Sequence, residues 1–245
     1  MEEQDIRAWL DKSNQQMLTE IEVFVPVNFV LWEKKNYACH IHKDNGKPCS
    51  AEILCKEPLS QAKIAHELLH AKTSLILGDN GIMFCVEEQT VPFQYMLKGN
   101  GASDIGNVCE HVIFFPDYLD MGYDEGEAFE EPERLSEQLE KLSFLANNGL
   151  KENGRYSSQR VFDYLSLVFS LLFYPNENRF KREIKQLRKI DIPLFSRIMK
   201  MKDACMDMAI VPENKEVLQE AYYVFANDMN QWFAKAFEGA VFTTE

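Results

Sequence analysis

Residues 60–78 read SQAKIAHELLHAKTSLILG, and this segment predicts the central helix of the N-terminal part of the chain. Ser60 belongs to the residue types that cap the start of a helix. Gly78 is the residue type that most often follows the last turn of a helix. Between them apolar residues recur at helical spacing, and the pattern HELLH occupies positions 66–70. Its two histidines are four residues apart, so they share one face of the predicted helix.

The HELLH pattern predicts a metal site. The imidazoles of His66 and His70 can share one tetrahedral zinc ion from the same helical face. Glu67 then lies beside the ion, where it can act as the general base that takes a proton from a zinc-bound water. The apolar flanks of the motif predict a buried helix, and buried histidines need partners, which a metal supplies. The alternative is a pair of core histidines that are satisfied by hydrogen bonds.

A catalytic zinc usually has three protein ligands and one water, so a third ligand is needed. A second helix is predicted from about residue 103, and its segment NVCEH offers Glu110 and His111, whose side chains point about 100° apart. Its buried face is formed by the apolar residues Ile105, Val108, Cys109, Val112, Phe115 and Leu119. His111 lies on the flank of this face and Glu110 nearly opposite its centre, so we favour His111 and keep Glu110 as the alternative. Asn107, one turn before His111, is expected to hold the orientation of a ligand.

Strand patterns precede the HELLH helix. Residues 5–21 have helical spacing, whereas residues 22–34 alternate and are rich in Val and Phe. Pro26 within that run favours an edge strand or a bulge. Residues 36–57 predict two short strands around Asn45-Gly46, which is a strong hairpin signal. Residues 79–100 carry no regular pattern and are expected to be irregular.

Beyond residue 122 every apolar pattern has helical spacing. We therefore predict an α+β protein, with a small twisted sheet and the two metal-site helices in residues 1–122. Residues 123–245 are expected to form an all-helical region that packs on the first part, either as a second domain or within one continuous domain. Pro116 is expected to bend or interrupt the second helix, and Gly122 to follow its end.

A strand that leads through a short turn into an HELLH helix, with a second helix about 40 residues later, resembles the zincin metallopeptidases. The chain is similar to the small intracellular zincins of the ImmA/IrrE type, whose second helix carries an Asn followed nine residues later by a Pro. Asn107 and Pro116 have this spacing. The small residues usual between them are replaced here by Glu110 and His111.

The resemblance covers roughly residues 20–122 and implies a zincin-like fold with one catalytic zinc ion. It implies peptide hydrolysis as the reaction and does not specify the substrate. Zincins of the gluzincin type use a Glu as third ligand, which favours Glu110. The strand that ends at Lys56 is expected to present an edge to which an extended peptide adds.

Composition limits the remaining classes. The net charge of −13 argues against general nucleic-acid binding and against binding to anionic membranes. The first residues lack the pattern of a secretory signal, and no stretch reaches the ~18 apolar residues that a bilayer span needs. None of the 6 cysteines forms a CxxC pair, so we expect reduced thiols and a cytoplasmic protein.

The leading hypothesis is a zinc-dependent metallopeptidase that acts on a peptide or protein substrate. A zinc-bound water, activated by Glu67, would attack the peptide bond. The alternative is a zincin-like module without catalysis that serves as a sensor or interaction domain. In either case the C-terminal helices are a candidate surface for a protein partner.

Overall fold

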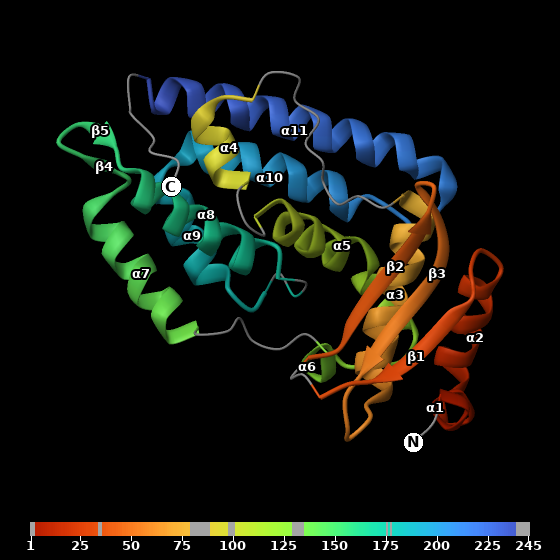
Figure 1. Cartoon of the computed structure of the whole chain (residues 1–245). Coiled ribbons are helices and arrows are strands. Elements are labelled where there is room, and N and C mark those ends of the chain that lie inside the picture. Colours follow the sequence, from red (N-terminus) through yellow and green to blue (C-terminus); the bar gives the residue numbers. More distant parts are fainter. Residues whose placement is uncertain are drawn as a thin grey trace. The chain divides into compact units, whose positions relative to one another are not determined.

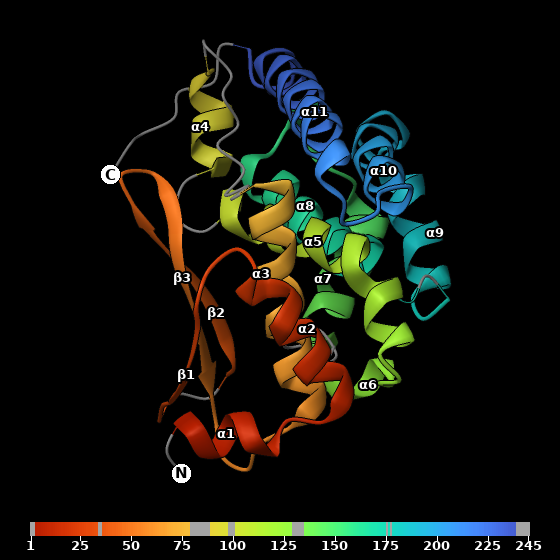
Figure 2. The same cartoon turned by 90° about the vertical axis from the view of Figure 1, so that its right-hand side faces the viewer.

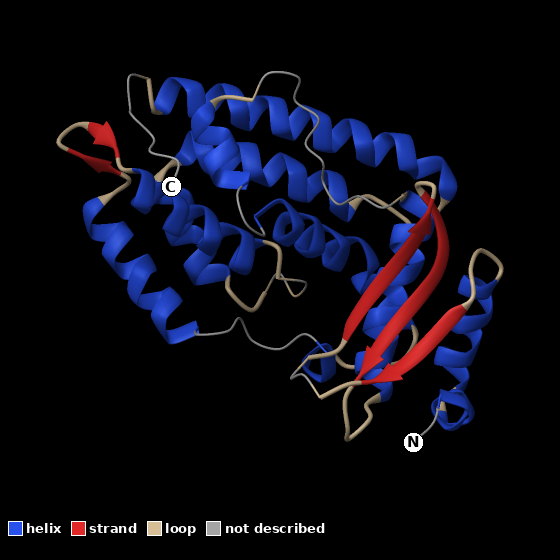
Figure 3. Ribbon diagram, viewed as in Figure 1, coloured by secondary structure: helices blue, strands red, loops and turns tan. Residues whose placement is uncertain are grey.

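The computed structural model describes residues 3–33, 36–78, 89–97, 101–128, 135–174, 176 and 178–238 (Figure 1). It confirms the predicted α+β class, with a small sheet near the N-terminus and helices through most of the rest (Figure 3). The contacts between residues divide the chain into two compact units. Unit 1 comprises Met1–Asp79, Phe114–Glu130 and Ala209–Lys215, and unit 2 comprises Asn80–Ile113, Glu131–Met208 and Glu216–Glu245. The boundary near residue 122 stays a prediction.

Unit 1 is built on a three-stranded sheet. Its elements are α1 (Glu3–Trp9), α2 (Lys12–Glu22), β1 (Val27–Leu31), β2 (Ala38–Asp44), β3 (Lys47–Cys55), α3 (Gln61–Leu77), the end of α5, α6 (Glu125–Ala128) and the 3₁₀ turn η1 (Pro212–Asn214). The single N-terminal helix expected over residues 5–21 is instead two helices. Asp11 separates them, because its side chain caps α2 by accepting a hydrogen bond from the backbone N–H of Asn14 at 2.9 Å.

The strand order in the sheet is β1-β3-β2. The predicted hairpin is confirmed: β2 and β3 are antiparallel, and Asn45 and Gly46 in the turn have φ of 50° and 78°. The expectation of an edge at the strand ending near Lys56 is wrong, because β1 pairs in parallel with the other side of β3. The edges of this sheet are β1, which Pro26 precedes as predicted, and β2.

Helix α3 has the predicted caps. The Ser60 side chain accepts a hydrogen bond from the backbone N–H of Lys63 at 3.3 Å, and Gly78 ends the helix with φ of 92°. α3 packs against α2, β2 and β3, and Figure 2 shows α2 and α3 on the same side of the sheet. On β1 the alternation of buried Val27 and Phe29 with exposed neighbours puts the apolar face of the strand in the core of unit 1.

Helix α5 (Gly101–Asp120) belongs to both units, because its residues up to Ile113 group with unit 2 and those from Phe114 with unit 1. Pro116 was expected to bend or interrupt this helix, and the interruption is wrong, since α5 continues through it. Pro116 is exposed on the helix surface. Gly122, with φ of 91°, follows the end of the helix as predicted.

Unit 2 is mainly helical. Besides the start of α5 it contains α4 (Val91–Leu97), α7 (Leu135–Asn148), β4 (Lys151–Glu152), β5 (Arg155–Tyr156), α8 (Ser158–Leu172), α9 (Lys181–Ile190), α10 (Ile192–Met206) and most of α11 (Lys215–Ala236). The C-terminal helices were predicted, but the short hairpin β4-β5, with its turn at Asn153-Gly154, was not. Residues 79–100 were expected to be irregular, and this is wrong for residues 91–97, which form helix α4. Every helix in the described ranges is too short or too polar to cross a bilayer.

Candidate metal centre

Two histidines of α3 face the same space. His66 and His70 are four residues apart on the helix, and their ring centroids lie 4.7 Å apart with the ring planes at 87°. His70 is buried with 8% of its surface exposed, whereas His66 is half-buried. This is the arrangement predicted from the i, i+4 spacing, and it requires the capped helix described above.

Phe114 of α5 packs against both imidazoles. Its ring lies 4.8 Å from the ring of His70 and 5.5 Å from that of His66, edge-on to each, and it is completely buried. His111 precedes Phe114 by three residues on the same helix, so the two side chains lie about 60° apart around the helix axis. The contact of Phe114 with α3 therefore also directs His111 toward α3.

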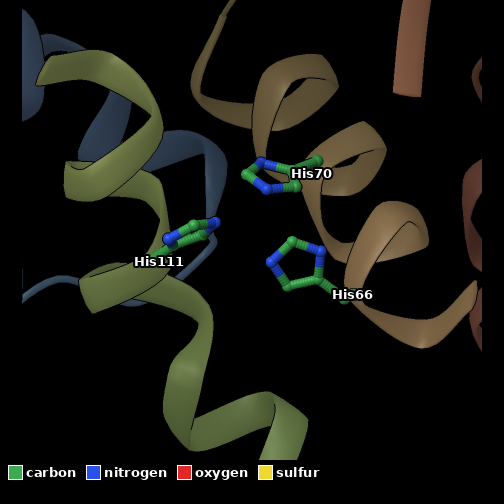
Figure 4. A group of neighbouring side chains, drawn as sticks. All are labelled: His66, His70 and His111. Carbon is green, nitrogen blue, oxygen red and sulfur yellow. The ribbon is translucent and has the colours of Figure 1, made fainter. Parts of the chain in front are cut away.

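His66, His70 and His111 form a candidate metal site. Each offers one ring nitrogen, and the three nitrogens all lie within 4.8 Å of one another. Figure 4 shows His66 and His70 projecting from α3 toward His111, which projects from α5. Glu110 is not part of this group. Three imidazoles around one point are close enough to hold a metal ion.

Glu67 lies against the first of these imidazoles. Its Oε1 is 3.0 Å from Nδ1 of His66, and only 7% of the residue is exposed. Burial by itself raises the pKa of the Glu67 carboxyl. The hydrogen bond with His66 and the electrostatic influence of His66, His70 and His40 act in the opposite direction, so the pKa is lowered overall. Glu67 is therefore an anion at neutral pH, next to a histidine of the site.

Two buried groups near Glu67, His70 and Cys55, are neutral at pH 7. Burial, together with the charge of His66, lowers the pKa of His70 to about 3, although the charge of Glu67 opposes this shift. The neutral imidazole is the form that binds a metal ion. Burial and the charge of Glu67 raise the pKa of the Cys55 thiol to about 12, so Cys55 is an unreactive thiol at the end of β3.

The two remaining predicted site residues lie outside the cluster. Glu110 is half-buried. Burial is the main cause that raises the pKa of Cys109 and of Tyr222, and the charge of Glu110 adds to it, so its carboxylate acts on groups of unit 2. Asn107 is exposed, one turn before His111. Its orienting role stays a prediction.

Sequence reasoning missed two residues of this region. Phe114, which packs on both histidines of α3, was not placed on the buried face of α5. His40 is exposed on β2, and its charge acts on Glu67. No local signal marks either residue, since both depend on which elements pack together.

Comparisons with known proteins gave no relative: no protein-family model, no curated protein and no solved structure matches this chain.

Proposed function

We propose that this chain is a zinc-dependent metallopeptidase with a zincin-like N-terminal part, in which His66, His70 and His111 hold the ion and Glu67 is the general base. One observation carries the proposal. The histidine pair of the HELLH helix meets a third histidine from a separate helix, within 4.8 Å between ligand atoms. Three protein ligands are the usual number at a catalytic zinc, because the fourth position must stay open for water.

The donor set fits zinc. Nitrogens about 2.0–2.1 Å from a tetrahedral ion are about 3.4 Å apart. The three nitrogens here, at up to 4.8 Å, therefore need to approach by at most about 1.4 Å, which rotation of the side chains supplies. A neutral, buried His70 needs no deprotonation before it binds the ion. The hydrogen bond that His66 Nδ1–H donates to Glu67 Oε1 orients that ring with its opposite nitrogen, Nε2, available as ligand atom.

When bound, the zinc ion would polarise a peptide carbonyl and lower the pKa of a coordinated water to about 7. The chain itself supplies the proton acceptor. Glu67 is anionic at neutral pH, and its Oε1 contacts His66, so Oε2 is the oxygen assigned to accept the proton and later donate it to the leaving amine.

An extended peptide is the substrate class that the fold supports. β2 is an edge strand of the sheet, and its outer backbone groups can pair with an added strand. His40 of β2 acts electrostatically on Glu67, so this edge is close to the proposed base. β2 thereby takes the role that was first assigned to β3.

A second candidate is a metal-binding module without catalysis. The observation that favours it is the 3.0 Å contact between Glu67 Oε1 and His66 Nδ1, because a carboxylate in that position is also typical of a residue that only orients a metal ligand. In this case Glu67 contributes to metal affinity and to no reaction.

The substitution Glu67→Gln separates the two candidates. It keeps the shape of the side chain and removes the charge. The peptidase predicts hydrolysis of a peptide library by the zinc-loaded wild type and a loss of at least ~100-fold in the variant, which still binds zinc. The module predicts no hydrolysis by the wild type and zinc affinity that falls ~10- to 100-fold in the variant. Lys63→Gln, on the same helix, is the control and should match the wild type in both measurements.

A further inference from the structure

Helices α8, α9 and α10 of unit 2 line an open cavity of about 470 Å³ on the protein surface. Part of its wall is apolar and is formed by Leu172, Phe195 and Met199, with Ile184 beside them. A volume of this size is typical of pockets for small molecules, which combine an apolar wall with a few polar groups. None of these residues belongs to the candidate metal centre.

The rest of the wall is cationic. Lys181, Lys185 and Arg188 line the cavity from α9, where their i, i+4, i+7 spacing puts them on one helical face. Lys200 and Lys202 line it from α10. Asp203 is the single carboxylate among the residues that line the cavity. Five cations thus gather around one small cavity in a chain whose net charge is −13.

Four of these cations have no carboxylate close to them. Among the described residues, no carboxylate lies within ion-pair distance of Lys181, Lys185, Arg188 or Lys200. Like charges held close together repel one another. A bound anion would offset this repulsion.

We propose that this cavity binds a phosphorylated small molecule whose apolar part lies against Phe195 and Met199. A phosphate carries up to two charges and three acceptor oxygens, so one group can contact several of these cations at once, which a single carboxylate does less well. Arg188 supplies a planar fork for two phosphate oxygens, and the lysines supply mobile point charges. The apolar wall accounts for the remainder of the ligand.

The test uses calorimetric titration of the full chain with inorganic phosphate, AMP and octyl phosphate, at near-physiological ionic strength. AMP and octyl phosphate represent a nucleotide and a lipid-like source of the same phosphate chemistry. At least one of them should bind ~10-fold or more tightly than inorganic phosphate, because only they fill the apolar part of the cavity. The tighter of the two identifies the source.

Helix α9 offers a matched pair of variants. Lys185→Gln/Arg188→Gln removes two charges from the cavity, and Arg182→Gln/Lys189→Gln removes two exposed charges of the same helix that do not line it. All four side chains are exposed, so both variants should fold, which far-UV circular dichroism checks. The cavity variant should bind ~100-fold more weakly, since each charged contact contributes about tenfold, and the control should stay within ~2-fold of the wild type.

Three results would overturn the proposal. The first is no binding of either organic phosphate by the wild type. The second is an equal loss in both double variants, which would mean attraction to the whole helix rather than to the cavity. The third is binding of inorganic phosphate or of hexaglutamate as tight as that of AMP and octyl phosphate, which would mean an adventitious ion only or a site for acidic peptides.

Discussion

The substitution His111→Ala tests the third metal ligand, and Glu110→Ala is its matched control. The two residues are adjacent on α5 and both half-buried, and only His111 offers a nitrogen within 4.8 Å of those of His66 and His70. Structural zinc sites with four ligands bind with about 10 to 16 kcal/mol, or about 2.5 to 4 kcal/mol per ligand. Loss of one imidazole should therefore weaken zinc binding about 100- to 1,000-fold.

Competition with a chromophoric chelator measures this affinity directly. Equilibrium unfolding in urea provides a second readout, because zinc stabilises only the folded state. Each tenfold loss of affinity removes about 1.4 kcal/mol of the zinc-dependent stabilisation. His111→Ala should thus lose about 2.5 to 4 kcal/mol of that stabilisation, whereas Glu110→Ala should keep it. Metal-free samples of all three proteins give the baseline that separates ligand loss from a change in the stability of α5.

Two results would refute this reasoning. If Glu110→Ala loses as much zinc affinity as His111→Ala, or more, the carboxylate completes the site as in the gluzincins, and α5 must rotate by about 100° on binding. If His111→Ala binds zinc with the affinity of the wild type, the convergence of the three imidazoles does not reflect coordination.

Two further predictions concern stability. In metal-free protein the pKa of His70 is lowered to about 3 from 6.5, so between these values the unfolded chain binds a proton that the folded chain does not. Above pH 6.5 the titration of His70 should leave the free energy of unfolding, measured in urea, unchanged. Below pH 6.5 this free energy should fall by up to about 1.4 kcal/mol per pH unit. This slope should vanish in His70→Gln and persist in His42→Gln, an exposed control. Phe114→Ala should cost about 3 to 5 kcal/mol, because it empties a fully buried position, whereas Leu119→Ala, 45% exposed on the same helix, should cost much less; equal costs would contradict the packing of Phe114 on α3.

The parts of the fold that were predictable from the sequence are those with local causes. Ser60 and Gly78 mark the two ends of α3. The Ser60 side chain accepts a hydrogen bond from a backbone N–H of the first turn, and Gly78 ends the helix through its own backbone conformation. The Asn45-Gly46 hairpin is equally local, since the turn needs two residues that tolerate positive φ. The helix around His66 and His70, and hence the i, i+4 pair, follows from signals within about twenty residues.

Features that depend on pairing between distant segments were not predictable in this way. β3 was expected to be an edge strand, and it is central because β1, more than twenty residues earlier, pairs with its other side in parallel. Alternation of apolar residues marks a strand but does not specify its neighbours. The positively charged cavity of unit 2 is a similar case, because α9 supplies three of its cations in a recognisable stripe and α10 supplies the other two only through packing.

Helix α5 shows why the third ligand was predicted on incomplete grounds. The apolar pattern of this helix predicts one buried face, defined by residues such as Ile105, Cys109 and Val112, with His111 on its flank. These three residues are buried, but Phe114 and Tyr118 are completely buried as well. Phe114 follows His111 by three residues, and Tyr118 follows Phe114 by four. The three side chains therefore form a second face, within about 60° around the helix axis.

A helix with two buried faces must pack against two sets of neighbouring side chains. The packing of α5 therefore links the candidate metal centre to the core. Phe114 and Tyr118 hold the end of α5 within unit 1: Phe114 contacts both histidines of α3, and the Tyr118 hydroxyl donates a hydrogen bond to the carbonyl of Asp124 at 3.2 Å. His111 lies one turn before Phe114 on a helix that is continuous through Pro116. Its position therefore depends on aromatic packing rather than on the metal, so the three imidazoles should converge in the metal-free protein, and zinc binding should require side-chain rotation more than folding of the site.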